Sequence, residues 1–361
     1  MGEVLIHTNS EVTSTAREDS LAARSTSAGH LRSLSLLLSL LRLGPLLILI
    51  VMITSASALS PYFLTPRNIS NVLAQTVVIA TLALGQYVVI LTRGIDLSVG
   101  SNIALCSVIG ALVYHTLPGL DGTSISILAI FTMLATGGLV GLINGAVFVY
   151  GRLPHPFIIT LATLSICKGL AFELSQGQTI SGVAPAVQFI GRQLIFGLPF
   201  SVLVVAAISL FLWYGRGLVW GRWIYAVGGN PDAAVRAGIP SKKVLVSVYV
   251  ISGICAAIGA VIIAGRTNSG SGLLGDLGEL DSIAAVIIGG ASFVGGRGNV
   301  GQALVGALMI GVMRNALNLL NVSIFFQLIV IGIVIVLAVE SDVMRAHLEN
   351  RFRVLQAAST S

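Results

Sequence analysis

Apolar runs of membrane-spanning length recur along almost the whole chain. A helix needs about 20 predominantly apolar residues to cross a bilayer, and ten runs approach or reach that length. They cover residues 43–60, 71–92, 97–115, 124–150, 157–175, 194–214, 243–265, 281–295, 300–320 and 323–340. Only 9% of the 361 residues are charged, against about 25% in soluble domains. We therefore expect an all-α polytopic membrane protein with about ten transmembrane helices.

The distribution of Lys and Arg predicts the orientation of these spans. With a cytoplasmic N-terminus, the inner segments hold fifteen of these residues and the outer loops only Arg67, Arg192 and Arg266. Cytoplasmic loops are enriched in positive charge, so both termini are expected in the cytoplasm. The expected organisation is a disordered cytoplasmic tail (1–42), a transmembrane domain (43–340) with a large inner loop (215–242), and a cytoplasmic tail (341–361).

Two short strings recur in the two halves of the chain. Gly94-Ile95-Asp96-Leu97-Ser98 opens the third run, and Gly278-Glu279-Leu280-Asp281-Ser282 opens the eighth. Leu139-Val140-Gly141 in the fourth run similarly matches Leu304-Val305-Gly306 in the ninth. Together they suggest a 5+5 duplication, which would be inverted in the membrane as in many transporters. The offsets are 184 and 165 residues, so chance explains the similarity equally well.

The motifs of soluble enzymes are missing or lack their context. No Lys follows a Gly, as a Walker A loop requires, and no two His lie three or four residues apart, as in a zinc-binding helix. The string Gly296 to Gly301 fits G-x-G-x-x-G, but an apolar run precedes it instead of a strand. We therefore expect no catalytic residues, metal or cofactor. The glycines of this region are interpreted as a helix break: Gly289, Gly290, Gly295, Gly296 and Gly298.

Small and polar residues inside the runs suggest close helix packing and a polar path. Gly137, Gly141 and Gly145 repeat every four residues, a spacing typical of tight helix contacts. Cys106, Cys167 and Cys255 lie inside apolar runs and are expected to be packed thiols. Lys168 and Glu173 lie five apart and cannot form an i,i+4 pair, so they either reach the outer surface or face a cavity. The dispersed basic residues give no reason to expect a nucleic-acid partner.

Several strings, taken in order, resemble the permease subunits of bacterial ATP-binding cassette importers for ribose, xylose, arabinose and galactosides. They are Gly85-Gln86, Gly94 to Ser101, Thr160 to Thr163, the segment 221–238, and the run from Glu279 through Gly298 to Asn315. The resemblance covers roughly residues 45–340. It implies a type II importer-like permease of the bacterial inner membrane that pairs with a second permease copy, identical or different. It also implies a separate ATPase dimer and a periplasmic binding protein that delivers a monosaccharide or related polyol.

Candidate residues for the solute path are chosen from this resemblance and from the polar side chains inside spans. Such side chains are costly in a bilayer, so each one suggests a functional or a packing role. They are Gln75, Gln86, Asp96, Ser98, Thr160, Thr163, Arg314 and Asn318. Amide and hydroxyl groups suit a neutral, hydroxyl-rich solute, but hydrogen bonds between packed helices are an equal alternative. The chain departs from the family pattern at Lys168, Leu277 and Ile331. No specific sugar is therefore carried over.

The inner loop 215–242 contains a predicted short helix. Asn230 suits an N-cap, Pro231 the first helical position, and Pro240 prevents a long continuation. The resemblance implies that this helix docks onto the ATPase through Pro231, Asp232, Ala233, Ala234 and Gly238. The alternative is a solvated connector without a partner.

Three other functions stay open from the sequence. The same machinery could carry a nucleoside or a sugar-like signalling molecule. A stand-alone secondary transporter would use intramembrane carboxylates for ion coupling, and Glu173 is the one candidate. A membrane enzyme is disfavoured by the missing catalytic motifs. Uptake that requires ATP would separate the importer from the stand-alone transporter and the enzyme.

Overall fold

The computed structural model describes residues 44–360, which are almost entirely helical. The expected N-terminal tail, 1–42, lies outside the described residues. Residues Pro45–Val339 form one compact unit, and Glu340 onward belongs to a second. The helices are Gly44–Leu59, α2 (Pro66–Leu91), α3 (Val99–Thr116), α4 (Gly122–Tyr150), α5 (Phe157–Leu174), α6 (Pro185–Arg192), α7 (Ser201–Gly215), α8 (Val219–Gly229), α9 (Pro231–Arg236), α10 (Ser241–Thr267), α11 (Gly278–Ile288), α12 (Val300–Leu319) and α13 (Ile324–Thr360).

Seven of the described helices are long and apolar enough to cross a membrane: α2, α3, α4, α5, α10, α12 and the first half of α13. An eighth span is possible if α7 and α8, which meet at a bend of 77°, count as one. The polytopic helical class expected from the sequence is thus confirmed.

Two of the predicted spans are shorter than expected, for local reasons. The run 281–295 is helical only as far as Ile288, because glycines with positive φ begin at Gly290. The run 194–214 becomes helical only at Ser201. Its first residues form instead the antiparallel hairpin of β2 (Leu194–Ile195) and β3 (Leu198–Pro199).

Close backbone contact holds the central helices together. α10 packs against α2 and α4, and the predicted glycine seam of α4 forms the latter contact. A Cβ on Gly141 would overlap the backbone carbonyl of Tyr249, and one on Gly145 would come within 2.8 Å of the Val246 Cα. Because these glycines lack a Cβ, the two long helices can touch backbone to backbone, as in membrane helix pairs.

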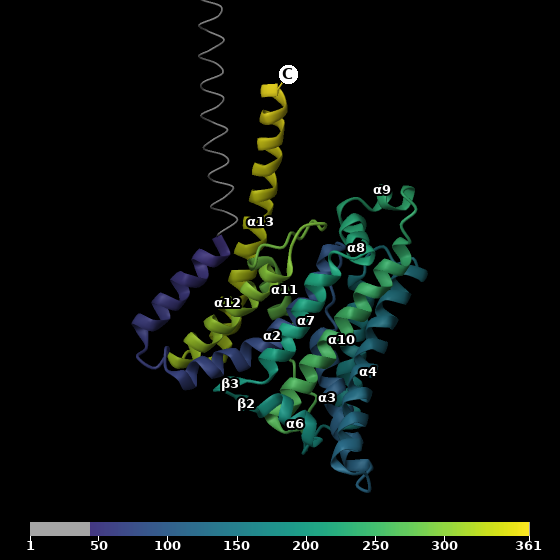
Figure 1. Cartoon of the computed structure of the whole chain (residues 1–361), viewed down its shortest axis with the longest axis vertical. Helices are drawn as coiled ribbons and strands as arrows, with labels where there is room; N and C mark the ends of the chain where they lie inside the picture. Colours follow the sequence, from purple (N-terminus) through teal and green to yellow (C-terminus); the bar gives the residue numbers. More distant parts are fainter. Residues whose placement is uncertain (1–43, 361) are drawn as a thin grey trace, which may run out of the picture. The chain divides into compact units, whose positions relative to one another are not determined.

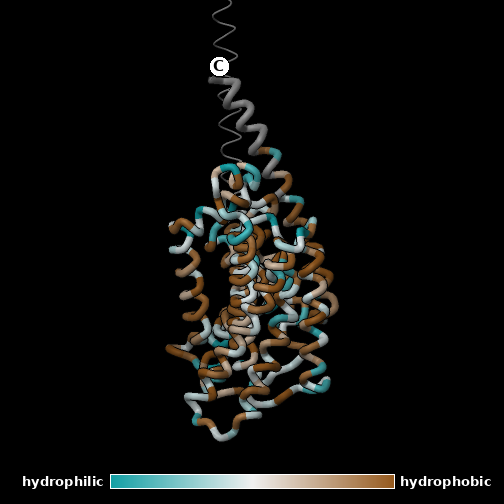
Figure 2. Tube along the Cα trace, turned by 90° about the vertical axis from the view of Figure 1, so that its right-hand side faces the viewer, coloured by the Kyte–Doolittle hydropathy of each residue, from teal (hydrophilic) through white to brown (hydrophobic). Residues whose placement is uncertain are grey.

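The unit Pro45–Val339 has two distinct ends (Figure 1). α8 and α9 lie at one end, whereas α6, β2 and β3 lie at the other. At this second end β1 (Ile180–Ser181) also pairs antiparallel with β4 (Ser269–Gly270). Hydrophobic residues predominate along the long helices between the two ends, and hydrophilic ones gather in the loops around α9 (Figure 2). We refer to the end with α8 and α9 as the α9 end and to the end with α6, β2 and β3 as the hairpin end.

Candidate coupling and translocation sites

The short helix predicted in the inner loop is confirmed as α9. The Asn230 side chain accepts a hydrogen bond from the Ala233 N–H at 3.0 Å, and Pro231 occupies the first helical position. Gly238 ends the helix with φ of 78°. Its N–H donates to the Val235 carbonyl at 3.0 Å, and the Ile239 N–H donates to Ala234 at 3.1 Å. This pair of bonds is the Schellman arrangement of a glycine helix end.

α9 presents one face to the surroundings and one to the protein. Pro231, Asp232, Ala233, Arg236 and Gly238 are exposed. Ala234 is only 4% exposed and belongs to the hydrophobic core, so this side of the helix packs against the protein. Sequence reasoning missed Val235, which is 62% exposed. In a helix of six residues nothing in the pattern indicates which small side chain turns inward.

The glycine-rich run between α11 and α12 is a helix break, as predicted. Gly289 caps α11 with a helical φ of −64°, and four following glycines adopt positive φ. They are Gly290 (99°), Gly295 (87°), Gly296 (69°) and Gly298 (149°). α12 then begins with a capping box in which Asn299 and Gln302 exchange side-chain to backbone bonds of 2.9 and 3.0 Å. Glycine permits this sequence of turns because it lacks a Cβ.

A buried carboxylate connects four elements within the unit. The Asp96 carboxylate, 1% exposed, accepts bonds from the Ser98 N–H (3.0 Å), the Ser98 hydroxyl (2.6 Å) and the Ser252 hydroxyl of α10 (2.8 Å). Asn144 of α4 donates to the Ser98 Oγ at 2.8 Å and accepts from Thr163 of α5 at 2.7 Å. Every partner of the Asp96 carboxylate is therefore a neutral donor, and the network ties the start of α3 to α4, α5 and α10.

Two further predicted residues hold the main chain around Asp96. The Gln86 amide, oriented to satisfy both groups, donates to the Asp96 carbonyl and accepts from its N–H, each at 3.2 Å. The Thr160 hydroxyl lies 3.5 Å from the Ile95 carbonyl. Five predicted path residues are thus brought together. Their polar atoms, however, form hydrogen bonds to other parts of the protein, as expected if they hold packed helices together and do not contact the solute. Sequence reasoning missed Asn144 and Ser252, which look like ordinary small or polar residues within apolar runs.

The remaining candidates lie apart from this network. Arg314 of α12 forms an ion pair of 2.8 Å with Asp281 in the first turn of α11, and the Arg314 and Asp281 side chains are 24% and 9% exposed. Asn318 is exposed and accepts a bond of 2.8 Å from Gln327 of α13. Gln75 is half-buried on α2. Arg314 and Asn318 therefore bond to different helices, although they lie one turn apart on α12.

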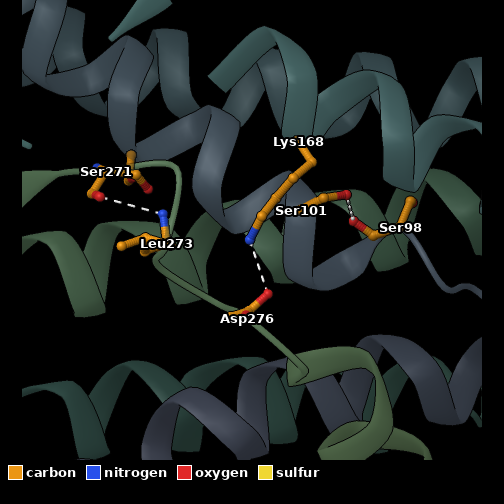
Figure 3. A network of polar contacts seen from close by, with 7 residues as sticks. Ser98, Ser101, Lys168, Ser271, Leu273 and Asp276 are labelled. Atoms are coloured by element: carbon orange, nitrogen blue, oxygen red, sulfur yellow. Dashed lines mark hydrogen bonds and ion pairs between the residues drawn. The ribbon is translucent and has the colours of Figure 1, made fainter. Parts of the chain in front are cut away.

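The segment that leads into α11 is held by an ion pair that the sequence did not indicate. Lys168 of α5 extends toward the segment 271–277 and contacts Asp276 at 2.9 Å (Figure 3). Two local hydrogen bonds are also visible there. The Leu273 N–H donates to the Ser271 hydroxyl within the segment, and the Ser101 hydroxyl donates to the Ser98 carbonyl at the first turn of α3. Lys168 thus reaches a partner 108 residues further along the chain.

α3 and α11 begin beside one another. A Cβ on Gly100 would overlap the Glu279 carboxylate, and one on Gly278 would lie 3.7 Å from the Gly100 Cα. Within the described residues, no three His, Cys, Asp or Glu side chains gather as metal ligands. All three cysteines are buried and free. The polar groups of this region can therefore bind hydroxyls or hold helices together, but no nucleophile or metal centre is assembled there.

Comparison with known proteins places the chain in a family. Residues 68–339 match the family model "Branched-chain amino acid transport system / permease component". The ribose import permease of Bacillus subtilis is 40% identical over 83% of this chain and 92% of its own length. The D-allose permease of Escherichia coli is 36% identical over 83% and 90%. The fructose import permease of Rhizobium meliloti is 34% identical over 82% and 84%.

No solved structure shows a significant match. The family model spans most of the unit Pro45–Val339, including α9, the glycine break and the Asp96 network. The relatives are permeases of import systems, and they match this chain over most of its length. The chain therefore belongs to this family of transport-system permease components and is a membrane subunit of an ABC importer, not an enzyme.

Proposed function

We propose that the chain forms the membrane path for a monosaccharide or a related polyol in a bacterial ABC importer. The observation that carries the proposal is that relatives named for ribose, allose and fructose import match more than four-fifths of this chain. A separate ATPase dimer would supply the energy, and a periplasmic binding protein would deliver the solute.

The test is uptake by proteoliposomes that contain the permease, its ATPase and its binding protein. Accumulation of a labelled pentose or hexose should require internal ATP and stop with vanadate. Transport of a nucleoside or a sugar-like signalling molecule, with the sugars excluded, would replace the solute class and keep the machinery. Uptake without ATP that collapses with an ionophore would favour a stand-alone secondary transporter and contradict the proposal.

We propose that α9 is the docking helix for the ATPase, through Pro231, Asp232, Ala233, Val235 and Gly238. The exposed Ala233 and Val235 leave room for a groove to close around the helix, with Ala234 packed beneath. An unpaired charge in such a contact is costly. Ala233→Glu and Val235→Asp should therefore reduce co-purification of the ATPase by about tenfold or more, a typical effect at an interface hot spot.

The matched control adds the same charge at the hairpin end. Thr123 is exposed in the first turn of α4, where an acidic residue is favourable. Thr123→Glu should leave ATPase association unchanged. Equal losses in Thr123→Glu and Ala233→Glu would show that α9 is only a connector.

Ten crossings are proposed, with both termini in the cytoplasm of a bacterium and the chain in its inner membrane. The helix Gly44–Leu59, α7 and α11 would add three shorter crossings to the seven long ones. The Lys and Arg bias supports this orientation. Single cysteines at Ser241 and Gln178, in a background without the buried native cysteines, should label from opposite sides of the membrane. Labelling of both from outside intact cells would contradict the model.

A 5+5 inverted repeat is proposed on the same basis. It would pair α2 with α10, α3 with α11, α4 with α12 and α5 with α13. Three likenesses support it. α2 and α10 are well-buried central helices, and α3 and α11 both follow non-helical segments with an Asp near their start. α5 and the stretch Ile324–Ser341 of α13 are both largely exposed. Those exposed faces would meet lipid and the second permease copy, identical or different. Native mass spectrometry of the purified complex should then show two permease chains for each ATPase dimer.

Solute contact is proposed for Gln75, Arg314 and Asn318. Their partial exposure at the hairpin end of the long helices supports this. Gln86, Asp96, Ser98, Thr160 and Thr163 would instead hold the wall of the path. Asn318→Ala should raise the KM for uptake, whereas a change in kcat alone would argue against contact with solute.

A further inference from the structure

The guanidinium of Arg93 donates two hydrogen bonds to the C-terminal end of α8, and we call this pair of bonds the grip. Arg93 follows α2 in the left-handed region, with φ of 64°. Its Nε donates to the Gly228 carbonyl and its Nη2 to the Gly229 carbonyl, both at 2.7 Å. Carbonyls at a helix C-terminus lack intrahelical donors and carry partial negative charge. Arg93 satisfies two of them with the forked geometry that only arginine provides.

Only one residue, the N-cap of α9, separates these two hydrogen bonds from the docking helix. Gly229 is the last residue of α8, and the next residue, Asn230, is the N-cap of α9. A displacement of α9 by a docked partner would therefore act directly on the two carbonyls that Arg93 holds.

The backbones around the grip are in direct contact. A Cβ on Gly228 would overlap the Leu91 carbonyl, and one on Gly296 would lie 2.6 Å from the Gly229 Cα. The Gly296 N–H also donates to the Leu91 carbonyl at 2.8 Å. Because no flexible side chain lies between these segments, the end of α8 cannot move far without displacing residues 91–93 and the glycine break.

A second attachment lies one helical turn earlier on α8. The Tyr225 hydroxyl donates to the Gly298 carbonyl at 2.8 Å and lies 2.6 Å from the Tyr87 hydroxyl of α2. α8 is thus joined at two levels both to α2 and to the loop between α11 and α12. Figure 1 shows α8 beside this loop at the α9 end.

The chain beyond Arg93 leads to the start of α3. Only five residues separate Arg93 from Val99, and Asp96 among them is anchored to α10 through Ser252. The first turn of α3 in turn lies against Glu279 of α11. The contacts therefore form a continuous path from α9 to the point where α3 and α11 begin together.

We propose that Arg93 is a positioning residue that couples the docking helix to the start of α3, so that ATPase motion reaches the solute path. This inference rests on the proposed docking of the ATPase at α9. It differs from a purely structural role, because losing the grip should impair the transfer of motion while leaving the complex assembled.

The experiment uses the full complex of permease, ATPase and binding protein in proteoliposomes. Arg93→Ala removes both bonds, and Arg93→Lys keeps the charge but loses the fork. Arg222→Ala is the matched control, because it also removes an arginine at the α9 end, this time an exposed one on α8 itself. ATPase co-purification, basal ATP hydrolysis, its stimulation by the solute-loaded binding protein, and uptake are measured for each variant.

Arg93→Ala should keep ATPase association and hold basal hydrolysis within about twofold of wild type. Stimulation and uptake should fall about tenfold or more, within the range of ordinary coupling between sites. Arg93→Lys should give an intermediate loss, and Arg222→Ala none.

Wild-type stimulation and uptake in Arg93→Ala would overturn the inference. If Arg93→Ala fails to assemble, Arg93→Lys decides: full coupling in that variant would also overturn it. A wild-type permease that binds no ATPase would instead overturn the proposed function, and the role of Arg93 with it.

Discussion

The starts of α3 and α11 are built alike but are held in opposite ways. Each follows a non-helical segment, and the two helices begin beside one another. Asp96 before α3 is 1% exposed and bonds only to hydroxyl and backbone donors, with Gln86 holding its main chain. Asp281 in the first turn of α11 pairs instead with a cation, Arg314.

The segments that lead into these helices differ in the same way. The segment before α3 is buried in the protein by Gln86, Ser252 and Thr160. The segment before α11 is held by the pair of Lys168 and Asp276, whose side chains are 26% and 63% exposed. Water screens such a pair and weakens it. The start of α3 is thus a closed junction, whereas the segment 273–277 before α11 is partly open to solvent, although the first turn of α11 is itself buried at Gly278, Asp281 and Ser282.

The largest expected effect comes from removing the cation at α11. Arg314→Met leaves the Asp281 carboxylate without its partner, and breaking such a pair costs about 3 kcal/mol. Adding Asp281→Asn should recover part of the loss, because the uncompensated charge is gone. Thermal unfolding in detergent, followed by size-exclusion chromatography, measures both variants. An unchanged melting temperature in Arg314→Met would mean that the two helix starts do not differ in this way.

A smaller effect is expected when the charge at α3 is removed. Asp96→Asn keeps an oxygen to accept from Ser98, and the Ser252 hydroxyl can turn to accept from the new amide. The loss should be about 1 to 2 kcal/mol, typical of one imperfect hydrogen bond at a buried site. The same unfolding assay applies. A loss as large as that of Arg314→Met would show that Asp96 must be charged.

The far end of the Asp96 network should contribute less. Thr163→Val removes the donor to Asn144, while Thr163→Ser keeps the hydroxyl as a control. We expect a loss of about 1 kcal/mol for the valine variant alone. Equal effects of Val and Ser would indicate that packing of the methyl group, and not the hydrogen bond, stabilises this contact between α4 and α5.

The smallest effect is expected for the exposed ion pair. A double-mutant cycle of Lys168→Gln and Asp276→Asn should give a coupling of less than about 1 kcal/mol. That coupling should decrease further at high salt, because exposed charges are screened. A coupling that is larger and insensitive to salt would place the segment 271–277 in the closed class with the start of α3.

Much of the helical framework follows from local sequence signals. The apolar runs predicted most helix positions to within a few residues, since the length and hydrophobicity of a span depend on its own residues. The cap at Asn230 and the positive-φ glycines near Gly296 were likewise predicted, because each depends on neighbours within one turn. The two shortened spans show the limit of this approach. Apolar residues also occur in hairpins and in extended segments inside a membrane protein.

The sites could be predicted only in part. Gln86, Asp96 and Thr163 were identified as polar residues that need a reason, but their use in holding helices was one of two equal readings. Ser252 lies 156 residues from its partner Asp96, and no local pattern indicates such a bond. The grip of Arg93 on α8 was missed for the same reason, since in the sequence this residue is one more inner-loop arginine.

By itself the sequence determined the membrane class, the order of the long helices and most, but not all, of the places where they begin and end. These properties arise from hydrophobic transfer and from capping, which act over at most one span. The tertiary structure decided that Ala234 is covered while Val235 is exposed, and that Asp96 has neutral partners while Asp281 has a cation. It also decided that Arg93 reaches the helix next to α9. Each of these depends on backbones from distant parts of the chain coming within a few ångströms, where a missing Cβ or one hydrogen bond selects the partner.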